Sequence, residues 1–401
     1  MDDDETNGII ETFLEPEVGG GCPIRIAAAI LKPDRWGVQR VVSGRGLTRE
    51  EAASRCKSEA MERHVAIFDE ARGILRGSPA DLGVAAIDPK SLLLISDRQY
   101  ANSHEWNSHV SEPHRLPPRL DRNREIAWVR ARSLIDGGIR LVPAASCFLG
   151  YPQAMEEGFP IPDSNGLASG DRLADAIERA LLETIERDAV SIWWYGRVNR
   201  PAMDLDGEEL SLRRPFEDWM HRSDRQFWVL DLTHDLGVPV AAAVSSNRGG
   251  SDLAFGFAAA RTKAAAAQAA MGELVQFEVT KTIQSRSRGG PPAGFLVWCM
   301  FARLDDHRFI FPSKDAAAQR IMPSPLGTVG IDLIRDKKLD VLLVDLTPQD
   351  QKTKVVRVVV PGLRPIWPRF APGRLYDIPF NLGWHDCRLN ETELNPIYIL
   401  Y

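Results

Sequence analysis

The sequence contains few cysteines, and they do not form a zinc-binding pattern. Its five cysteines are scattered along the chain. None belongs to a CxxC pair or to a Cys/His spacing typical of a zinc site. An odd, dispersed set of cysteines is typical of a reducing compartment, so we expect a cytoplasmic protein.

A surplus of positive charge and long apolar runs are also lacking. The net charge is −6, and no polybasic block is present, so nucleic acid is not expected as a partner. The longest apolar runs, such as 92–95 and 341–344, have the length of strands, so no membrane span is expected. The acidic first residues, MDDDETNG, are incompatible with a signal peptide.

Familiar catalytic motifs are missing as well. The sequence has no GxxxxGK[ST] phosphate loop and no GxSxG nucleophile motif. Its eight histidines do not form a recognisable Cys/His or Ser/His arrangement. Covalent catalysis therefore has no support in the sequence, and we assign no catalytic residue.

One acidic pattern is present twice. It reads Glu59-Ala-Met-Glu62-Arg63 at its first occurrence and Glu183-Thr-Ile-Glu186-Arg187 at its second. On a helix, residues three and four apart share a face, so each glutamate pair repels itself unless positive charge lies nearby. The following arginine supplies that charge if the pattern is a surface ion pair. A Mg²⁺ ion is the alternative, since it takes oxygen ligands and links carboxylates to phosphates.

Three long helices are expected around these and related residues. Thr48 and Glu51 form a capping box that begins a helix extending to about Phe68. Helical spacing of apolar residues predicts a second helix over 171–194. A third, alanine-rich helix over 263–280 carries Glu273 and Gln276.

Strands and loops are expected between the helices. We expect strands within 24–42, a hairpin over 125–142, a strand pair within 228–246, and strands at 341–346 and 355–360. The segments 43–46 and 164–170 are expected to be loops before helices, either simple turns or anion sites at helix N-termini. The segment 85–125 reads as strand fragments and a long loop, 285–294 as a linker, and 361–401 as proline-rich with little helix.

A weak internal recurrence is also present. Residues 228–233 (WVLDLT) resemble residues 343–347 (LVDLT), and an apolar strand follows each. This recurrence suggests that two halves of the chain share an architecture.

The order of these segments resembles the YcaO family of ATP-using enzymes. The resemblance covers residue 40 to the C-terminus and includes the two Glu-x-x-Glu-Arg helices, Glu273-Leu-Val-Gln276 and Val359-Val-Pro-Gly-Leu363. The segments 367–379, 382–384 and 394–396 are similar to azoline-forming members, the cyclodehydratase D subunits of thiazole/oxazole-modified (linear azole-containing) peptide pathways.

The resemblance implies an α+β YcaO fold with mixed or antiparallel sheets, an internal pseudo-repeat, and packed helices that bring their glutamates together around an ATP site. It divides the chain into a flexible N-terminal segment, 1–24, and a YcaO domain, 25–401, whose proline-rich end is 361–401. It implies ATP and Mg²⁺ as cofactors. The implied metal ligands are Glu59, Glu62, Glu183, Glu186 and Glu273, and the implied nucleotide-binding residues are Arg63, Asn165, Arg187 and Gln276.

The implied activity is ATP-dependent conversion of Cys, Ser or Thr in a ribosomal precursor peptide to thiazoline or oxazoline. The implied partners are that peptide, an E1-like leader-peptide-binding subunit, a flavin-dependent dehydrogenase, and a second copy of the chain within the complex. The alternatives are a thioamide- or amidine-forming YcaO enzyme and a non-catalytic peptide-binding scaffold. The chain departs from the family at Arg55 and Ala269, where Ser and Gln or Arg are frequent, and in a tail that keeps only Pro396.

Overall fold

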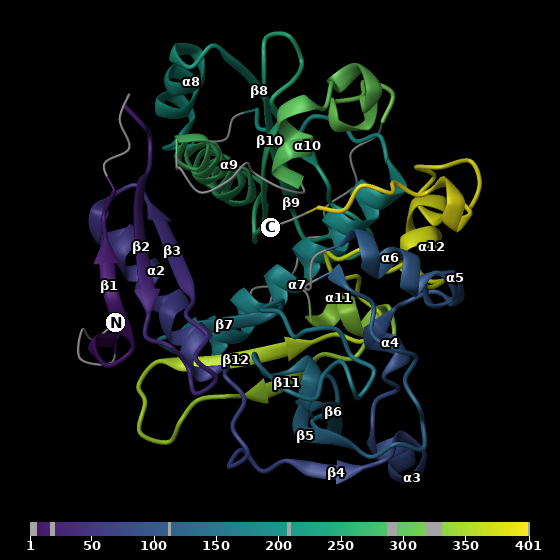
Figure 1. Ribbon diagram of the computed structural model, residues 1–401. Helices are drawn as coiled ribbons and strands as arrows, with labels where there is room; N and C mark the ends of the chain where they lie inside the picture. The colour runs from purple at the N-terminus through teal and green to yellow at the C-terminus, as the bar shows by residue number, and fades with distance from the viewer. Residues whose placement is uncertain are drawn as a thin grey trace.

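The structure, a computed structural model, describes residues 6–16, 21–110, 114–206, 210–286, 295–316 and 331–399. Helices pack on three antiparallel sheets, as expected for the α+β class (Figure 1). The strands are β1 (Ile10–Leu14), β2 (Arg25–Leu31), β3 (Val41–Gly46), β4 (Leu75–Gly77), β5 (Ile126–Ser133), β6 (Ile139–Pro143), β7 (Leu167–Gly170), β8 (Arg225–Asp231), β9 (Val240–Asn247), β10 (Ala254–Ala259), β11 (Leu342–Asp345) and β12 (Lys354–Val359). The helices are α2 (Arg49–Val65), α3 (Pro79–Leu82), α4 (Lys90–Leu93), α5 (Asp97–Ala101), α6 (Ser103–His109), α7 (Leu173–Gly196), α8 (Arg213–Arg222), α9 (Lys263–Arg286), α10 (Phe295–Phe301), α11 (Ile331–Asp336) and α12 (Arg374–Asn381).

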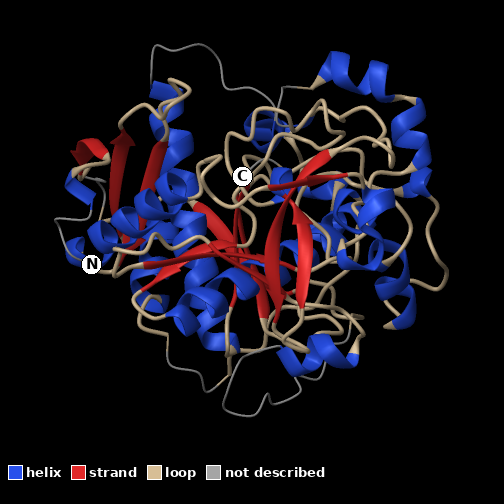
Figure 2. Cartoon of the chain, turned by 90° about the horizontal axis from the view of Figure 1, so that it is seen from below, coloured by secondary structure: helices blue, strands red, loops and turns tan. Residues whose placement is uncertain are grey.

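Each of the three long helices covers an antiparallel array of three strands. α2 packs on the sheet β1-β2-β3, and α9 packs on the sheet β10-β9-β8. α7 packs on β7 and β12, which continue through β11 into a six-stranded sheet containing β4, β5 and β6. Figure 2 shows helices lying between separate groups of strands.

The expected recurrence within the chain is confirmed by this arrangement. The two similar segments contain β8 and β11, which are equivalent strands of their arrays. After each strand the chain makes the same turn. The Thr233 N–H donates to Asp231 Oδ1 at 2.9 Å, and the Thr347 N–H donates to Asp345 Oδ1 at 2.9 Å.

Glycines allow two of these helices to approach their strands closely. A Cβ atom on Gly44 of β3 would lie 2.2 Å from the Ala52 carbonyl oxygen in α2. A Cβ atom on Gly256 of β10 would lie 2.2 Å from the Ala270 carbonyl oxygen in α9. The expectation of a loop at 43–46 is therefore wrong, because the segment belongs to strand β3 and Gly44 serves helix packing.

Other segments expected to be irregular also contain regular structure. The first 24 residues are not flexible throughout, because residues 10–14 form β1 and pair with β2. Residues 167–170 form β7, which pairs with a strand nearly 190 residues later in the chain. Residues 90–109 form α4, α5 and α6 instead of strand fragments, and 374–381 form α12 despite an internal proline. Of the expected linker, 285–286 belong to α9, and 287–294 lie outside the described residues.

The expected long helices and strands are present with shifted ends. Thr48 caps α2 as predicted, its side chain accepting the Glu51 N–H at 3.1 Å. α2 ends three residues earlier than expected, α7 begins and ends two residues later, and α9 extends six residues further. Trp193 and Trp194 at the end of α7 are buried in the largest core cluster, where each packs edge-on against Phe309.

A buried ionic network attaches the C-terminal part of the chain to α7. The fully buried Asp188 carboxylate accepts hydrogen bonds from Arg374 at 2.6 Å and from the Arg364 backbone N–H at 2.7 Å. His234 lies 3.1 Å from the same carboxylate. Arg374 also pairs with Asp235 at 2.7 Å, so both acids are compensated. Arg374 and His234 hold the pKa of Asp188 below its ordinary value despite burial.

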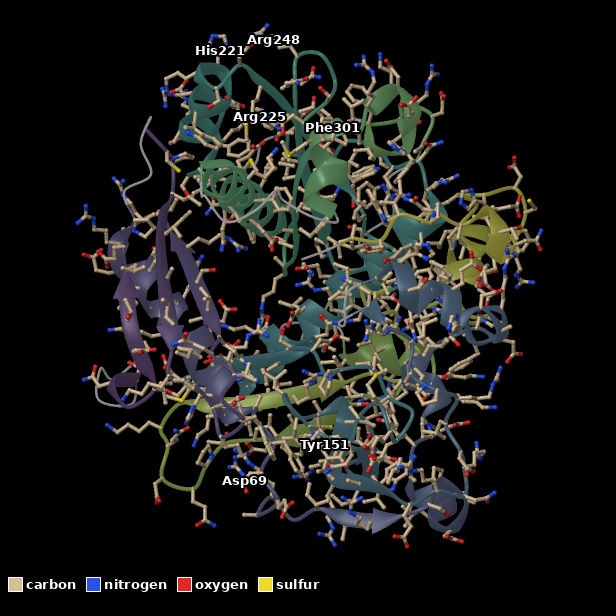
Figure 3. The ribbon with its side chains drawn as sticks, viewed as in Figure 1. Asp69, Tyr151, His221, Arg225, Arg248 and Phe301 are labelled. Carbon is tan, nitrogen blue, oxygen red and sulfur yellow. The ribbon has the colours of Figure 1, made fainter. Side chains whose placement is uncertain are left out.

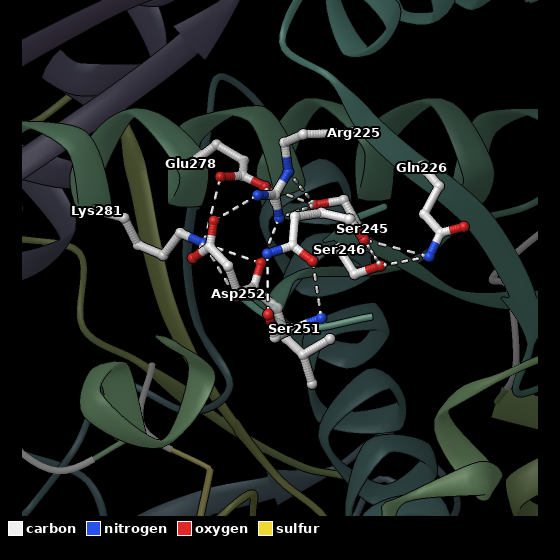
Figure 4. Close-up of polar contacts among 10 residues, drawn as sticks. Arg225, Gln226, Ser245, Ser246, Ser251, Asp252, Glu278 and Lys281 are labelled. Carbon is white, nitrogen blue, oxygen red and sulfur yellow. Dashed lines mark hydrogen bonds and ion pairs between the residues drawn. The ribbon is translucent and has the colours of Figure 1, made fainter. Parts of the chain in front are cut away.

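A second network fixes α9 to its sheet (Figure 4). Arg225 of β8 lies 2.6 Å from both Asp252 and Glu278. Lys281, one turn along α9 from Glu278, pairs with Asp252 at 2.8 Å. The Ser245 hydroxyl donates to Glu278 at 2.5 Å. These contacts join α9 to β8, to β9 and to the segment before β10.

In the described parts of the chain, no helix has both the length and the apolar character needed to cross a membrane.

We predict that Gly256→Ala destabilises the fold and that Gly272→Ala does not. The added methyl at position 256 would overlap the α9 backbone, and overpacking of this kind costs about 1–3 kcal/mol or more. At position 272 the nearest atoms are 3.6 Å away, so the alanine fits and improves helix propensity by roughly 0.5–1 kcal/mol. Chemical denaturation of both variants measures the difference. Equal stabilities would contradict the close helix–strand contact.

Candidate functional site

A cavity of about 680 Å³ lies where the three helix–strand units meet. Its wall is formed by β3, α2, the segment before β7, α7, α9 and residues 366–367. Figure 3 shows side chains projecting into this region between β3, α9 and α7, while Asp69 and Arg248 lie at the periphery. The wall contains eight of the nine residues implicated by sequence, namely Glu59, Glu62, Arg63, Asn165, Glu183, Arg187, Glu273 and Gln276.

Glu186, the ninth residue, does not line the cavity but lies beside it. Its carboxylate is 3.3 Å from the Arg187 guanidinium, which does line the cavity. Its charge also interacts with Glu273 and Glu183. The structure therefore brings all nine residues to one region, with Glu186 behind the others.

Three glutamates are fixed in the same way, by a backbone N–H from a neighbouring strand or the segment leading into it. The Ser43 N–H donates to Glu59 at 3.0 Å, and the Phe257 N–H donates to Glu273 at 2.8 Å. The Gly166 N–H lies 3.3 Å from Glu183. In each case one carboxylate oxygen is held, which orients the side chain. The Ser43 N–H is thus occupied by Glu59 and is not available to an anion, although residues 43–45 line the cavity.

Glu62 is held by a different element and carries a perturbed charge. Its Oε1 accepts from the Ser169 N–H at 2.8 Å and from the Ser169 hydroxyl at 2.9 Å. Burial, together with the nearby charges of Glu59 and Glu183, nevertheless raises its pKa to about 7. Burial and the charges of Glu273 and Glu183 likewise raise the pKa of Glu186 to about 7. The lining of the cavity contains five carboxylates and four arginines, so acidic groups outnumber basic ones by one.

The cations of the cavity are arginines paired with these acids. Arg63 lies 3.1 Å from Glu59, and Arg187 lies 3.5 Å from Glu183. The pairing with the following arginine that the sequence suggested is therefore present. It does not cancel the effect of burial, which is the main reason that the pKa values of Glu62 and Glu186 are raised.

Two residues of the cavity were missed by sequence reasoning. Arg45 of β3 donates to Gln276 Oε1 at 2.9 Å and lies 3.9 Å from Glu273. Gln276 in turn donates to the Ser43 hydroxyl at 2.8 Å, which joins α9 to β3. Alternation along β3 places residues 43 and 45 on one face, and recognising 41–46 as a strand would have identified Arg45.

Asp163 is the second missed residue, and it organises the segment that carries Asn165. Its carboxylate accepts from the Asn165 backbone N–H and side-chain amide, both at 2.9 Å. Trp367 donates its indole N–H to the same carboxylate, and Arg357 lies 3.4 Å away. The C-terminal part of the chain thus reaches the cavity through Trp367. The C-terminal carboxylate of Tyr401 lies outside the described residues.

The donor set fits Mg²⁺ and a nucleotide. Carboxylate oxygens are the ligands that Mg²⁺ prefers, and the five glutamates line or adjoin one cavity. Among the residues that the structure describes, no three acidic, His or Cys side chains are placed to hold one ion together. Mg²⁺ usually completes its shell with water and substrate phosphates, so ligation by one or two of these carboxylates is sufficient.

Comparison with known proteins shows which family and which solved structures this chain resembles. The model of one family, described as YcaO cyclodehydratase, ATP- and Mg²⁺-binding, matches residues 43–364. An uncharacterized protein of Methanothermobacter thermautotrophicus is 28% identical over 355 residues, which are 85% of this chain and 86% of that protein. A solved heterocyclase in complex with substrate and cofactor is similar with a TM-score of 0.88 at 30% identity over 98% of this chain. The match covers 55% of that heterocyclase, so this chain spans about half its length.

A second solved structure shares the fold at greater distance. It is YcaO from Methanopyrus kandleri bound with AMPPCP and Mg²⁺, with a TM-score of 0.63 at 21% identity over 90% of this chain and 87% of that one. The matched region, 43–364, begins in β3 and includes α2, α7 and α9, which carry the acidic residues of the cavity. This chain is therefore a member of the YcaO cyclodehydratase family, whose members bind ATP and Mg²⁺.

Proposed function

We propose that this chain is the ATP-dependent cyclodehydratase of a pathway that makes an azole-containing, bacteriocin- or microcin-like peptide. In that reaction a Cys, Ser or Thr side chain attacks the preceding backbone carbonyl. ATP supplies a phosphoryl group to the resulting oxygen, and loss of phosphate leaves a thiazoline or oxazoline. The balance is removal of one water from the peptide and conversion of ATP to ADP and phosphate.

The observation that carries the proposal is the acidic cavity with paired arginines. Phosphoryl transfer depends on positioning and on neutralising charge, more than on a protein nucleophile. Glu59, Glu62, Glu183 and Glu273 would hold Mg²⁺, and Glu186 would support them from behind. The heterocyclase that matches 98% of this chain was solved with its substrate and a cofactor, which supports a peptide reaction here.

The nucleotide contacts are proposed for the remaining residues of the cavity. Arg63 and Arg187 would offset the charge of the phosphates, as guanidinium groups do at phosphate sites. Gln276 and Asn165 present amides on opposite walls and would orient the nucleotide. Both amides are already fixed, Gln276 by Arg45 and Ser43 and Asn165 by Asp163, so they are held in place before a ligand arrives.

Partner proteins are part of the proposal. The match covers 55% of the solved heterocyclase, so this chain spans about half the length of that protein. We propose that an E1-like subunit binds the leader of the precursor peptide and that a flavin-dependent dehydrogenase oxidises azoline to azole. We also propose that the complex contains two copies of this chain and that it is located in the cytoplasm.

We predict that Glu183→Gln and Glu186→Gln abolish activity. Each change removes a negative charge from the proposed Mg²⁺ site, and loss of one electrostatic contact at a phosphoryl-transfer site typically costs about 100-fold or more in rate. ATP turnover and peptide modification are measured together. Glu178→Gln, a change on the same helix in an outward pair with Arg261, serves as the matched control. A scaffold subunit would keep supporting modification in the first two variants.

We predict that the modified precursor peptide loses one water mass per converted residue. Mass spectrometry of the peptide after reaction with the complete set of pathway proteins makes this measurement. An exchange of oxygen for sulfur would raise the mass and identify a thioamide-forming enzyme instead. An unchanged mass with ATP turnover intact would contradict azoline formation.

We predict that stabilisation by Mg²⁺ increases with pH. The pKa values of Glu62 and Glu186 are about 7 in the folded chain and about 4.3 when unfolded. Folding therefore favours their protonated forms, so stability without metal falls as pH rises from about 4.5 through 7. Mg²⁺ needs the charged forms, and its effect should be larger at pH 8 than at pH 5.5. Melting temperatures with and without Mg²⁺ test this. An equal shift at both pH values would refute it, and Glu62→Gln should reduce the dependence.

A further inference from the structure

A second cavity lies directly behind the acidic one. It has a volume of about 150 Å³, roughly ten times what one water molecule requires. It shares Asp163, Asn165, Arg187 and Trp367 with the acidic cavity, so these four residues separate the two spaces. Its far wall contains Arg364 and Arg369 together with apolar residues such as Leu92 and Phe159.

Arg369 is buried without a counter-charge. Its exposed fraction is 3%, and its guanidinium donates through Nη1 to the Pro368 carbonyl at 3.2 Å. Its Nη2 atom has no hydrogen-bond partner. Within the described ranges, no carboxylate oxygen lies within 4 Å of this guanidinium. The carboxylate that acts on it most closely is Asp163, which is already occupied by Arg357, Asn165 and Trp367.

Arg364 is also buried, but it differs from Arg369 because the nearby Asp188 carboxylate acts on its charge. Its exposed fraction is 2%, and its guanidinium donates to backbone carbonyls of Arg369, Ala371 and Pro372. These carbonyls accept hydrogen bonds but do not neutralise the charge, and Nε has no partner. Burial lowers the pKa of both arginines to about 10.

Among the described residues, three other buried arginines contact carboxylates, and a fourth, Arg200, packs on an aromatic ring although its Nη1 has no hydrogen-bond partner. Arg225 and Arg374 each contact two carboxylates, and Arg357 contacts Asp163. Arg200 lies 3.9 Å from the Trp384 ring, which offers a cation–π contact. Burying an unpaired charge costs several kcal/mol, so the position of Arg369 beside a cavity, with no carboxylate partner among the described residues, favours binding of an anion there.

The geometry points to an oxyanion subsite in this second cavity that takes inorganic phosphate, with Arg369 as a principal ligand. Phosphate is the anion chosen because the adjoining cavity is the proposed site of phosphoryl transfer; this assignment rests on the proposed function. Arg187 borders both spaces and contributes positive charge to each. Thr184 and Ser146 add hydroxyl-bearing residues to the lining. A phosphate released from the nucleotide cavity would thus meet a second basic site next to it.

The test is phosphate binding to the full chain with the nucleotide cavity filled. Mg²⁺ and a non-hydrolysable ATP analogue are kept saturating, and inorganic phosphate is titrated by calorimetry and thermal melting. We expect phosphate to bind and to raise the melting temperature. Arg369→Met should weaken binding about tenfold or more, the effect of losing a charge-assisted hydrogen bond. Arg261→Met, at an exposed ion pair, should leave binding unchanged. Absence of phosphate binding, or equal binding by Arg369→Met, overturns the inference.

Stability without phosphate gives an independent readout. If Arg369 is kept for an anion, Arg369→Met in phosphate-free buffer should be at least as stable as the parent chain, because an unpaired buried charge is removed. A large loss of stability or failure to fold would show a structural role and overturn the inference. Arg369→Lys, which keeps the charge but loses the two-pronged geometry, should fold and bind phosphate more weakly than the parent.

Competition experiments with other anions distinguish a phosphate site from a carboxylate site. Sulfate should compete with phosphate and acetate should not; protection by acetate alone would assign the cavity to a carboxylate and overturn the phosphate assignment. None of these measurements uses peptide or hydrolysable ATP. Failure of azoline formation would therefore leave phosphate binding unaffected, and failure of phosphate binding would leave the proposed activity unaffected.

Discussion

The site depends on a hydrogen bond from a backbone N–H in or beside a strand to a glutamate on the helix that covers it. This contact occurs between Ser43 and Glu59, between Gly166 and Glu183, and between Phe257 and Glu273. It requires the helix to lie very close to the strand, and Gly44 and Gly256 permit that distance. The same contact between helix and strand thus occurs three times, and in each case it orients a glutamate toward the same cavity.

The same arrangement explains why the chain tolerates an unfavourable collection of charge. Glu59, Glu62, Glu183 and Glu273 each accept a backbone N–H. All of the five glutamates except Glu62 lie within 4 Å of an arginine. Burial nevertheless raises the pKa of Glu62 and of Glu186 to about 7. The ionic networks around Asp188 and around Glu278 lie away from the cavity and are compensated internally. They hold α7 and α9 firmly, so the repulsion within the cavity is not relieved by movement of these helices. The repulsion between carboxylates in the cavity is thus opposed by the ionic networks that hold α7 and α9 in position.

Much of this could be predicted from the sequence. Helical spacing and the capping residue Thr48 located α2, α7 and α9 to within a few residues, and the repeated Glu-x-x-Glu-Arg pattern identified most of the acidic wall. The recurrence of an Asp-x-Thr turn after β8 and β11 indicated related units. Local patterns suffice here because the acidic residues of each unit lie on that unit's own helix.

The parts that sequence reasoning missed depend on contacts between distant segments. The strand character of 41–46 is hidden by two glycines, and with it the inward direction of Arg45. Asp163 gains its importance from Trp367 and Arg357, nearly 200 residues away. α12 forms around Pro379 because Arg374 is anchored by Asp188 and Asp235. Patterns within a short stretch of sequence cannot predict a hydrogen-bond or ion-pair partner that comes from a distant part of the chain.

The order of strands has a consequence for synthesis on the ribosome. The unit built on α2 and the unit built on α9 each come from one continuous stretch, so each can fold soon after it emerges. The middle unit is different, because β7 pairs with β12, and α7 packs on β12, more than 140 residues later in the chain. The face of α7 that packs on β12 is therefore covered only after residue 359 has been made, a delay typical of high contact order. The acidic cavity, whose wall includes residues 366–367, is completed only after that part of the nascent chain has been made.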